Sequence, residues 1–224
     1  MGLLDDYEPP AVRPLPVVLL LDASGSMKAE DKIEVLNDGV REMIRELQEV
    51  DNGLGIILLS IIAFGGDSAY VVHRHVPVAG LRYESLQAAG RTPLGEAFRL
   101  AHELVDDREA LPNRAYRATI ALVSDGIPTD REWDKHLDGL VGSERGGKAT
   151  RFALAIGSDA DHEMLTRFTG GQPPHTADQA AKIRTFLQFV TTQITQATRT
   201  IVRPDAVEDV PSDSRLRLTD NDAF

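Results

Sequence analysis

Hydrophobic positions in this chain form two kinds of pattern, short unbroken apolar runs and helical stripes. The first run, from Val17 to Leu21, is stopped by Asp22. Such runs are typical of strands that are buried on both faces of a parallel sheet. Apolar residues then recur at spacings of three and four from Ile33 to Leu47, which predicts an amphipathic helix.

The same alternation of run and stripe continues along the chain. Further strands are predicted at residues 56–64, 69–76, 118–123 and 151–156, and further helices around residues 94–104, 133–140, 162–168 and 178–200. Gly65-Gly66-Asp67 predicts a hairpin-like turn between the second and third strands. Strand–helix alternation of this kind favours an α/β fold with a doubly wound, mostly parallel sheet and helices on both faces.

The ends of the chain differ in composition from this region. Residues 1–14 are rich in proline and acids and predict an extended N-terminal arm, whereas residues 203–224 predict an acidic C-terminal tail. Residues 15–202 would then form one domain. Within the tail, Arg215–Thr219 alternates and offers a second interpretation, an added edge strand or a contact with a partner.

Charge and composition narrow the class of function. The 224 residues carry a formal net charge of -11, which disfavours nucleic acid as a partner and favours divalent cations or basic surfaces. There is no cysteine for disulfides or thiolate metal sites. The N-terminus has no basic n-region, and the longest apolar stretch, 54–64, is too short to cross a bilayer. We therefore expect a cytoplasmic protein with no membrane partner.

Oxygen-bearing side chains follow the first predicted strand. Asp22, Ser24 and Ser26 form an Asp-x-Ser-x-Ser turn in which Gly25 lets the backbone fold so that both hydroxyls point inward. One carboxylate and two hydroxyls suit a hard cation such as Mg²⁺, with Mn²⁺ and Ca²⁺ as alternatives. Taken alone, the same turn is also a common helix-capping sequence.

Two further oxygen ligands lie later in the chain. Thr92 precedes a predicted helix, and Asp125 ends a predicted strand. Open α/β sheets bind ligands at the carboxyl ends of strands where the winding direction reverses. If the strands that end in Asp22 and Asp125 are neighbours at that reversal, all five side chains converge.

These residues carry a resemblance to a known family. Asp22, Ser24, Ser26, Thr92 and Asp125 resemble, in type, order and spacing, the metal-ion-dependent adhesion site of von Willebrand factor A (VWA) domains. The resemblance covers about residues 14–200. The sequence LPVVLLLDASGSM, residues 15–27, is similar to bacterial tellurite-resistance-associated (TerY-like) VWA proteins.

The resemblance implies a six-stranded Rossmann-like sheet, a metal held by these five residues, and a coordination position left for an Asp or Glu of a partner protein. It implies a binding module, not an enzyme, and a place in a bacterial stress-response or defence system with a protein kinase or PP2C-type phosphatase as partner. Where the family commonly has glycine before the threonine, this chain has Arg91, which either steers an acidic partner or is solvated surface.

The charge of the ion suggests how such a site would work. If Ser24 and Ser26 bind directly while Asp22 and Asp125 act through water or hydrogen bonds, the ion keeps much of its positive charge and attracts a carboxylate.

Two alternative functions stay open. One is a Mg²⁺-dependent phosphohydrolase, although that chemistry needs an acid where Ser24 stands. The other is a structural subunit with a vestigial metal site.

Thr92 also has a structural interpretation when it is taken alone, and Asp130, His73 and His75 are expected to be structural. Thr92 is a natural N-cap for the helix that follows it, and Asp130 is expected to cap the helix that contains Trp133. His73 and His75 share a strand face and are expected to be exposed, with no third metal ligand and no Ser–His pairing for nucleophilic catalysis.

Overall fold

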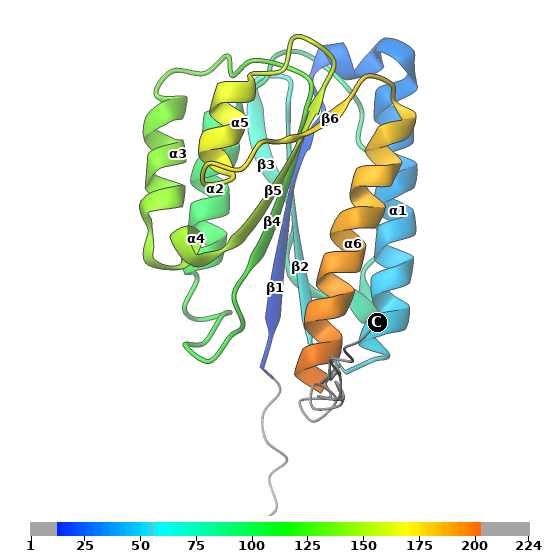
Figure 1. The fold of residues 1–224 in the computed structure, drawn as a ribbon, viewed down its shortest axis with the longest axis vertical. Coiled ribbons are helices and arrows are strands. Elements are labelled where there is room, and N and C mark those ends of the chain that lie inside the picture. Colours follow the sequence, from blue (N-terminus) through cyan, green and yellow to red (C-terminus); the bar gives the residue numbers. More distant parts are fainter. Residues whose placement is uncertain (1–12, 55, 203–224) are drawn as a thin grey trace, which may run out of the picture.

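The computed structural model describes residues 13–54 and 56–202, and these form a six-stranded sheet with helices on both faces (Figure 1). The strand order is β3-β2-β1-β4-β5-β6, and only β3 runs antiparallel to its neighbour. The strands are β1 (Leu15–Asp22), β2 (Ile57–Gly65), β3 (Ser68–Pro77), β4 (Thr119–Ser124), β5 (Thr150–Ile156) and β6 (His175–Ala177).

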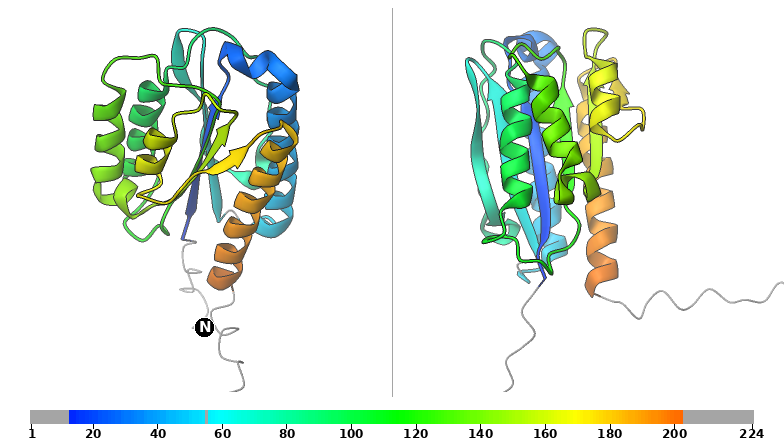
Figure 2. Two further views of the ribbon diagram at one scale, coloured as in Figure 1. Left: turned by 45° about the horizontal axis from the view of Figure 1, so that its top comes forward. Right: turned by 90° about the vertical axis from the view of Figure 1, so that its left-hand side faces the viewer.

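The helices divide between the two faces of the sheet, as the views in Figures 1 and 2 agree. Helices α1 (Lys32–Asp51) and α6 (Ala181–Val202) cover one face. The other face carries α2 (Leu94–Asp106), α3 (Trp133–Gly142), α4 (Glu144–Lys148) and α5 (His162–Phe168). Short 3-10 helices η1 (Gly25–Asp31) and η2 (Val78–Gly80) complete the order. None of the described helices combines the length and apolar character needed to cross a bilayer.

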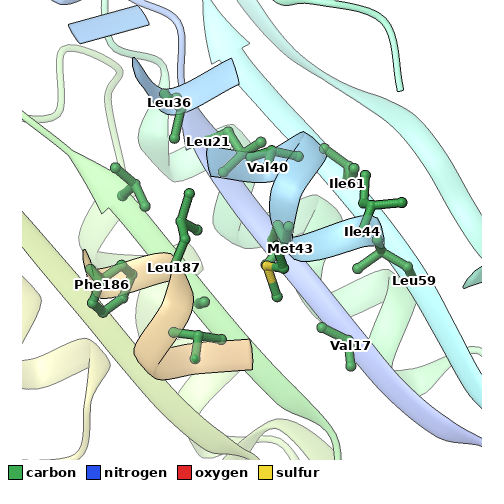
Figure 3. Close-up of a cluster of buried hydrophobic side chains, with 14 of the residues drawn as sticks. Val17, Leu21, Leu36, Val40, Met43, Ile44, Leu59, Ile61, Phe186 and Leu187 are labelled. Atoms are coloured by element: carbon green, nitrogen blue, oxygen red, sulfur yellow. The ribbon is translucent and has the colours of Figure 1, made fainter. Parts of the chain in front are cut away.

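Strand β1 supplies side chains to both apolar cores. Leu19 and Leu21 pack on the α1 and α6 side, whereas Val18 and Leu20 pack on the α2 side. Figure 3 shows the first of these cores, in which side chains of β1 and β2 meet those of α1 and α6. Burying each such aliphatic side chain stabilises the fold by about 1.5–3 kcal/mol. This explains why β1 is an unbroken apolar run.

The order of strands and helices predicted from the pattern is confirmed, with differences at the ends of elements. The pattern did not predict β6 or α4, because both elements are short. Strand β6 has three residues, of which the first two are exposed, and α4 has five residues. Strand β6 is held by parallel pairing with β5 and by a hydrogen bond of 2.8 Å from the Gly157 amide to the Ala177 carbonyl. Helix α6 begins at Ala181, three residues later than expected. The predicted tail, with its Arg215–Thr219 stretch, and residues 1–12 of the predicted arm lie outside the described residues.

The sheet topology determines where a site can form. β1 pairs in parallel with both β2 and β4, so the chain reverses its winding direction between β1 and β4. Asp22 ends β1 and Asp125 follows β4 directly. Because neighbouring parallel strands end at the same edge of the sheet, these two carboxylates lie beside each other at the position where open α/β sheets bind ligands.

Candidate metal site

Four of the five predicted ligands lie in one network of hydrogen bonds. The Ser24 and Ser26 hydroxyl oxygens are 3.0 Å apart, and the Ser26 hydroxyl donates to Asp125 Oδ1 at 2.6 Å. Asp22 Oδ1 accepts the backbone amide of Ser24 at 2.8 Å. Asp22 and Ser24 are buried, whereas Ser26 is exposed. The group of oxygens is therefore buried on the strand side and reaches solvent at Ser26.

Asp22 is the most deeply placed acid of the site. It is fully buried, and that burial raises the pKa of its carboxyl from 3.8 to about 6. Hydrogen bonds from Ser24 and from the Ser124 hydroxyl, 2.7 Å from Asp22 Oδ2, lower the pKa, and the nearby charge of Asp125 raises it. The net effect is a carboxylate whose negative charge is only partly compensated by its neighbours. A bound cation would supply the missing compensation.

Three loops are joined at the site by backbone hydrogen bonds. Ala23 joins β2 to the loop that carries Thr92. The Ala23 amide donates to the Phe64 carbonyl at 2.8 Å, and the Ala23 carbonyl accepts the Ala89 amide at 2.8 Å. The Gly25 amide donates to the Gly90 carbonyl at 3.0 Å. Gly90 has a φ of +63°, and a Cβ there would lie 2.4 Å from the Cα of Gly66. Glycine is therefore required at position 90 for the loop that carries Thr92 to approach the first loop.

Thr92 lies close to the loop that follows Asp125, but it does not cap a helix. Its hydroxyl oxygen is 3.4 Å from the point where a Cβ on Gly126 would stand. The N-cap of α2 is Pro93, with no hydrogen bond from its own side chain, so the predicted N-cap role of Thr92 is wrong. The helix is capped from a distant segment instead, by Asp130.

Asp130 accepts two backbone amides at the start of α2. Its oxygens lie 3.0 Å from the Gly95 nitrogen and 2.8 Å from the Glu96 nitrogen. The prediction that Asp130 caps the helix containing Trp133 is therefore wrong, and Glu132, with a φ of +59°, precedes that helix. Sequence spacing could not reveal this, because the two segments are more than 30 residues apart and meet only in the folded chain.

Asp130→Ala is expected to destabilise the protein by about 1–2 kcal/mol, because two amides at the start of α2 lose a charged acceptor. Urea unfolding measures this loss. Asp159→Ala removes one acid from an exposed loop and serves as the control. Equal stability of the two variants would contradict the capping role.

Two residues that the sequence did not single out belong to the site. Ser124, the last residue of β4, donates to Asp22 as described above. Lys32, the first residue of α1, places its Nζ 2.9 Å from Asp125 Oδ2. A serine that ends a strand and a lysine that begins a helix are common in sequences, so neither carried a signal.

The donor set suits a hard cation bound through few charges. Within residues 13–54 and 56–202, no three His, Cys, Asp or Glu side chains are grouped so that they could hold a metal. The site instead combines two carboxylates with serine and threonine hydroxyls. Oxygen ligands of this kind are those that hard divalent cations prefer.

The predicted exposure of His73 and His75 is wrong. Both residues are only partly exposed, and their Nε2 atoms are buried. His75 is also paired with a serine, because its Nδ1 lies 3.3 Å from the Ser60 hydroxyl and its Nε2 lies 3.6 Å from Asp107. This order of Ser, His and Asp resembles a hydrolytic triad, but Ser60 is fully buried in β2 and no substrate can reach it. The pairing is structural.

His75 predicts a pH dependence of stability. Burial lowers the pKa of its imidazole below 6.5, against an opposing effect of Asp107. The unfolded chain therefore binds a proton more readily, and the stability contributed by neutral His75 is lost as the pH falls below about 6.5. Urea unfolding at pH 7.5 and pH 5.5 should show a larger loss for the wild type than for His75→Asn. Identical losses would rule the effect out.

Sequence comparisons match the region that contains these residues to a known family. Residues 17–127 match the model of the von Willebrand factor type A domain, and this region contains all five predicted ligands. The chain is 23% identical over 164 residues to the uncharacterized protein YfbK of Escherichia coli, and 26% identical over 118 residues to the uncharacterized protein Rv2850c of Mycobacterium tuberculosis. These matches cover 66% and 50% of this chain, but only 25% and 18% of the two relatives.

Solved structures share the fold at low sequence identity. The pilus adhesin SpaC of Lactobacillus rhamnosus GG superposes with a TM-score of 0.68 at 16% identity, over 84% of this chain and 31% of the adhesin. Proximal thread matrix protein 1 of the mussel byssus, in a structure with a zinc-occupied MIDAS motif (the metal-ion-dependent adhesion site), gives 0.64 at 14% identity, over 82% and 48%. A von Willebrand factor type A structure from Catenulispora acidiphila gives 0.60 at 16% identity, over 82% and 43%. Residues 17–127 therefore match the von Willebrand factor type A family, and the described chain shares the fold of these solved structures.

Proposed function

We propose that the chain is a metal-dependent protein-binding module. A divalent cation, Mg²⁺ in the first instance and Mn²⁺ or Ca²⁺ as alternatives, would bind the five oxygen-bearing side chains of the site. A coordination position facing solvent would take an Asp or Glu carboxylate of a partner. The proposed ligands are Asp22, Ser24, Ser26, Thr92 and Asp125.

One observation carries this proposal. Asp22 and Asp125 come from the ends of neighbouring strands and are connected through two serines. The Ser24 amide donates to Asp22, the Ser24 hydroxyl contacts the Ser26 hydroxyl, and the exposed Ser26 donates to Asp125. The mussel protein of the same fold is described with zinc in its MIDAS motif, which supports a cation at the equivalent edge of this sheet.

The hydrogen bonds around Asp22 support the proposal that a bound ion would keep much of its positive charge. Both of its oxygens accept protein hydrogen bonds, one from the Ser24 amide and one from the Ser124 hydroxyl. In this arrangement Asp22 acts on a cation mainly at a distance, so the ion keeps positive charge for an incoming carboxylate. Ser24, where a phosphohydrolase would need an acid, is hydrogen-bonded to Ser26 and offers no proton donor of suitable acidity.

Exposed residues beside the site indicate what else a partner would contact. The Ile127 side chain, two residues after Asp125, is 60% exposed and is one of three large apolar residues exposed in the described chain. Arg91 is 75% exposed, with its nearest acid, Asp67, 3.9 Å away at the surface. A partner segment with a carboxylate next to an apolar side chain fits this surface.

The proposal extends to a biological setting. The resemblance of residues 15–27 to TerY-like proteins supports a bacterial scaffold, cytoplasmic, that serves a stress-response or defence system with a kinase or PP2C-type phosphatase as partner. The chain spans only about a quarter or less of the curated relatives, so their full-length activities do not transfer to it.

Peptide display on the full chain tests the proposed function. Selection in Mg²⁺ should recover peptides that contain an Asp or Glu, that dissociate in EDTA, and that stop binding when that acid is replaced by its amide. Ile127→Ser should weaken these peptides, whereas Leu54→Ser, a similarly exposed position that lies outside the site, should not. Peptides that bind equally well in EDTA, or turnover of a phosphate ester by the wild type, would overturn the proposal.

A further inference from the structure

The ammonium group of Lys32 forms an ion pair with Asp125, one of the proposed metal ligands. Lys32 Nζ is 2.9 Å from Asp125 Oδ2, and the two side chains are 15% and 1% exposed. The other oxygen of Asp125 accepts the Ser26 hydroxyl at 2.6 Å. Both oxygens of this buried carboxylate are therefore engaged by groups of the chain itself.

The position of Lys32 is unfavourable for the helix that contains it. Lys32 is the first residue of α1, where the helix dipole disfavours a positive charge. The two residues before it, Glu30 and Asp31, both have a φ of +54°, a left-handed conformation that residues other than glycine rarely adopt. Neither helix propensity nor backbone geometry explains the placement, whereas the ion pair with Asp125 does.

The ion pair sets up a competition between two cations. Asp22 and Asp125 contribute two carboxylates, and Lys32 contributes one positive charge a hydrogen bond away from the second. A divalent ion that binds Asp125 must either displace the ammonium or share the carboxylate with it. Both routes weaken binding, because like charges at such distances repel strongly where water is excluded.

We propose that Lys32 is an internal competitor of the metal: its ammonium holds Asp125 in place without a metal and lowers the affinity of the site for divalent cations. This inference rests on the proposed function, since it concerns the same site. The consequence is a site that fills only when the divalent cation is abundant or when a partner carboxylate adds to its binding. Metal occupancy and partner binding are then coupled through one ion pair.

Isothermal titration of the full chain with MgCl₂ and MnCl₂ tests the inference. Lys32→Met keeps the length of the side chain and removes its charge, and it should bind both ions on the order of 10-fold more tightly than the wild type. Lys28→Met, an exposed lysine in η1, makes the same change in net charge and should bind with wild-type affinity. Lys32→Gln provides a second variant with the same expectation if Lys32→Met fails to fold.

The outcomes separate this inference from the proposed function. A wild type that binds the ions while folded Lys32 variants bind no more tightly overturns the inference and leaves the proposed function intact. A wild type that binds neither ion while the Lys32 variants bind both supports the inference and overturns metal-dependent binding in the natural chain. Failure of every variant to bind a divalent ion overturns both.

Discussion

Asp22→Asn is expected to abolish the rise in melting temperature that the proposed Mg²⁺ binding would give the wild type. In EDTA at pH 7, it is expected to make the protein more stable than the wild type by about 1–3 kcal/mol. The loss of the Mg²⁺ response follows from linkage, because a ligand that binds only the folded state must stabilise it. The gain in EDTA follows from the burial of the carboxylate.

The sign of that gain comes from the pKa of Asp22. Burial raises the pKa of Asp22 from 3.8 to about 6. Between pH 3.8 and about pH 6, the folded state therefore holds a proton that the unfolded state has released. The stability contributed by this group is present at low pH and is lost as the pH rises through about 6. At pH 7 the ionised carboxylate costs about 3 kcal/mol, because the pKa of Asp22 rises from 3.8 to about 6 and each pH unit corresponds to about 1.36 kcal/mol.

Asparagine keeps the shape of the side chain without its charge. Its amide oxygen can accept the Ser24 amide, and its NH₂ group can donate to the Ser124 hydroxyl oxygen, which are the two contacts of Asp22. Chemical unfolding in EDTA and thermal unfolding with and without Mg²⁺ measure both effects.

Asp51→Asn is the matched control. Asp51 is also fully buried, but it is the last residue of α1, whereas Lys32 at the site is the first. Asp51 accepts the amides of Ile56 and Ile57 at 2.8 and 2.9 Å. Its replacement should destabilise the protein and leave the Mg²⁺ response unchanged. An Asp22→Asn protein that Mg²⁺ still stabilises as much as the wild type would refute the role of Asp22.

Gly65→Ala is expected to cost about 2–4 kcal/mol in stability and to weaken Mg²⁺ binding on the order of 10-fold. A Cβ on Gly65 would lie 2.2 Å from the carbonyl oxygen and 2.5 Å from the carbonyl carbon of Ala23. These are backbone atoms and cannot rotate away as a side chain can. The loop from Asp22 to Ser24 must shift, and Mg²⁺ tolerates little departure from octahedral geometry.

Gly80→Ala is the control for this change. A Cβ there meets nothing within 4 Å, and the residue has no positive φ, so stability should change by no more than about 0.5 kcal/mol. Urea unfolding and titration with MgCl₂ measure the two effects. A Gly65→Ala protein with wild-type stability would mean that the close approach of β2 to Ala23 does not constrain the site.

Local physics made most of the fold predictable from the sequence. Val17–Leu21 is apolar at every position because both faces of β1 are covered, and α1 carries its apolar stripe because one face packs on the sheet. The Asp-x-Ser-x-Ser turn was recognisable for a similar reason, since its ligands lie within five residues and their spacing depends on one loop. Such signals need only neighbouring residues to be read.

Tertiary structure alone decided the contacts between distant segments. The sequence left open whether the strands of Asp22 and Asp125 are neighbours, and their pairing in the sheet brings the two carboxylates together. Asp130 caps α2 only because the chain brings together segments that are 34 and 35 residues apart. Lys32 pairs with Asp125 across 93 residues. Hydrophobic periodicity describes which face of an element is buried, but hydrogen bonds and ion pairs across the sheet edge depend on the relative positions of whole elements, and no local pattern records those.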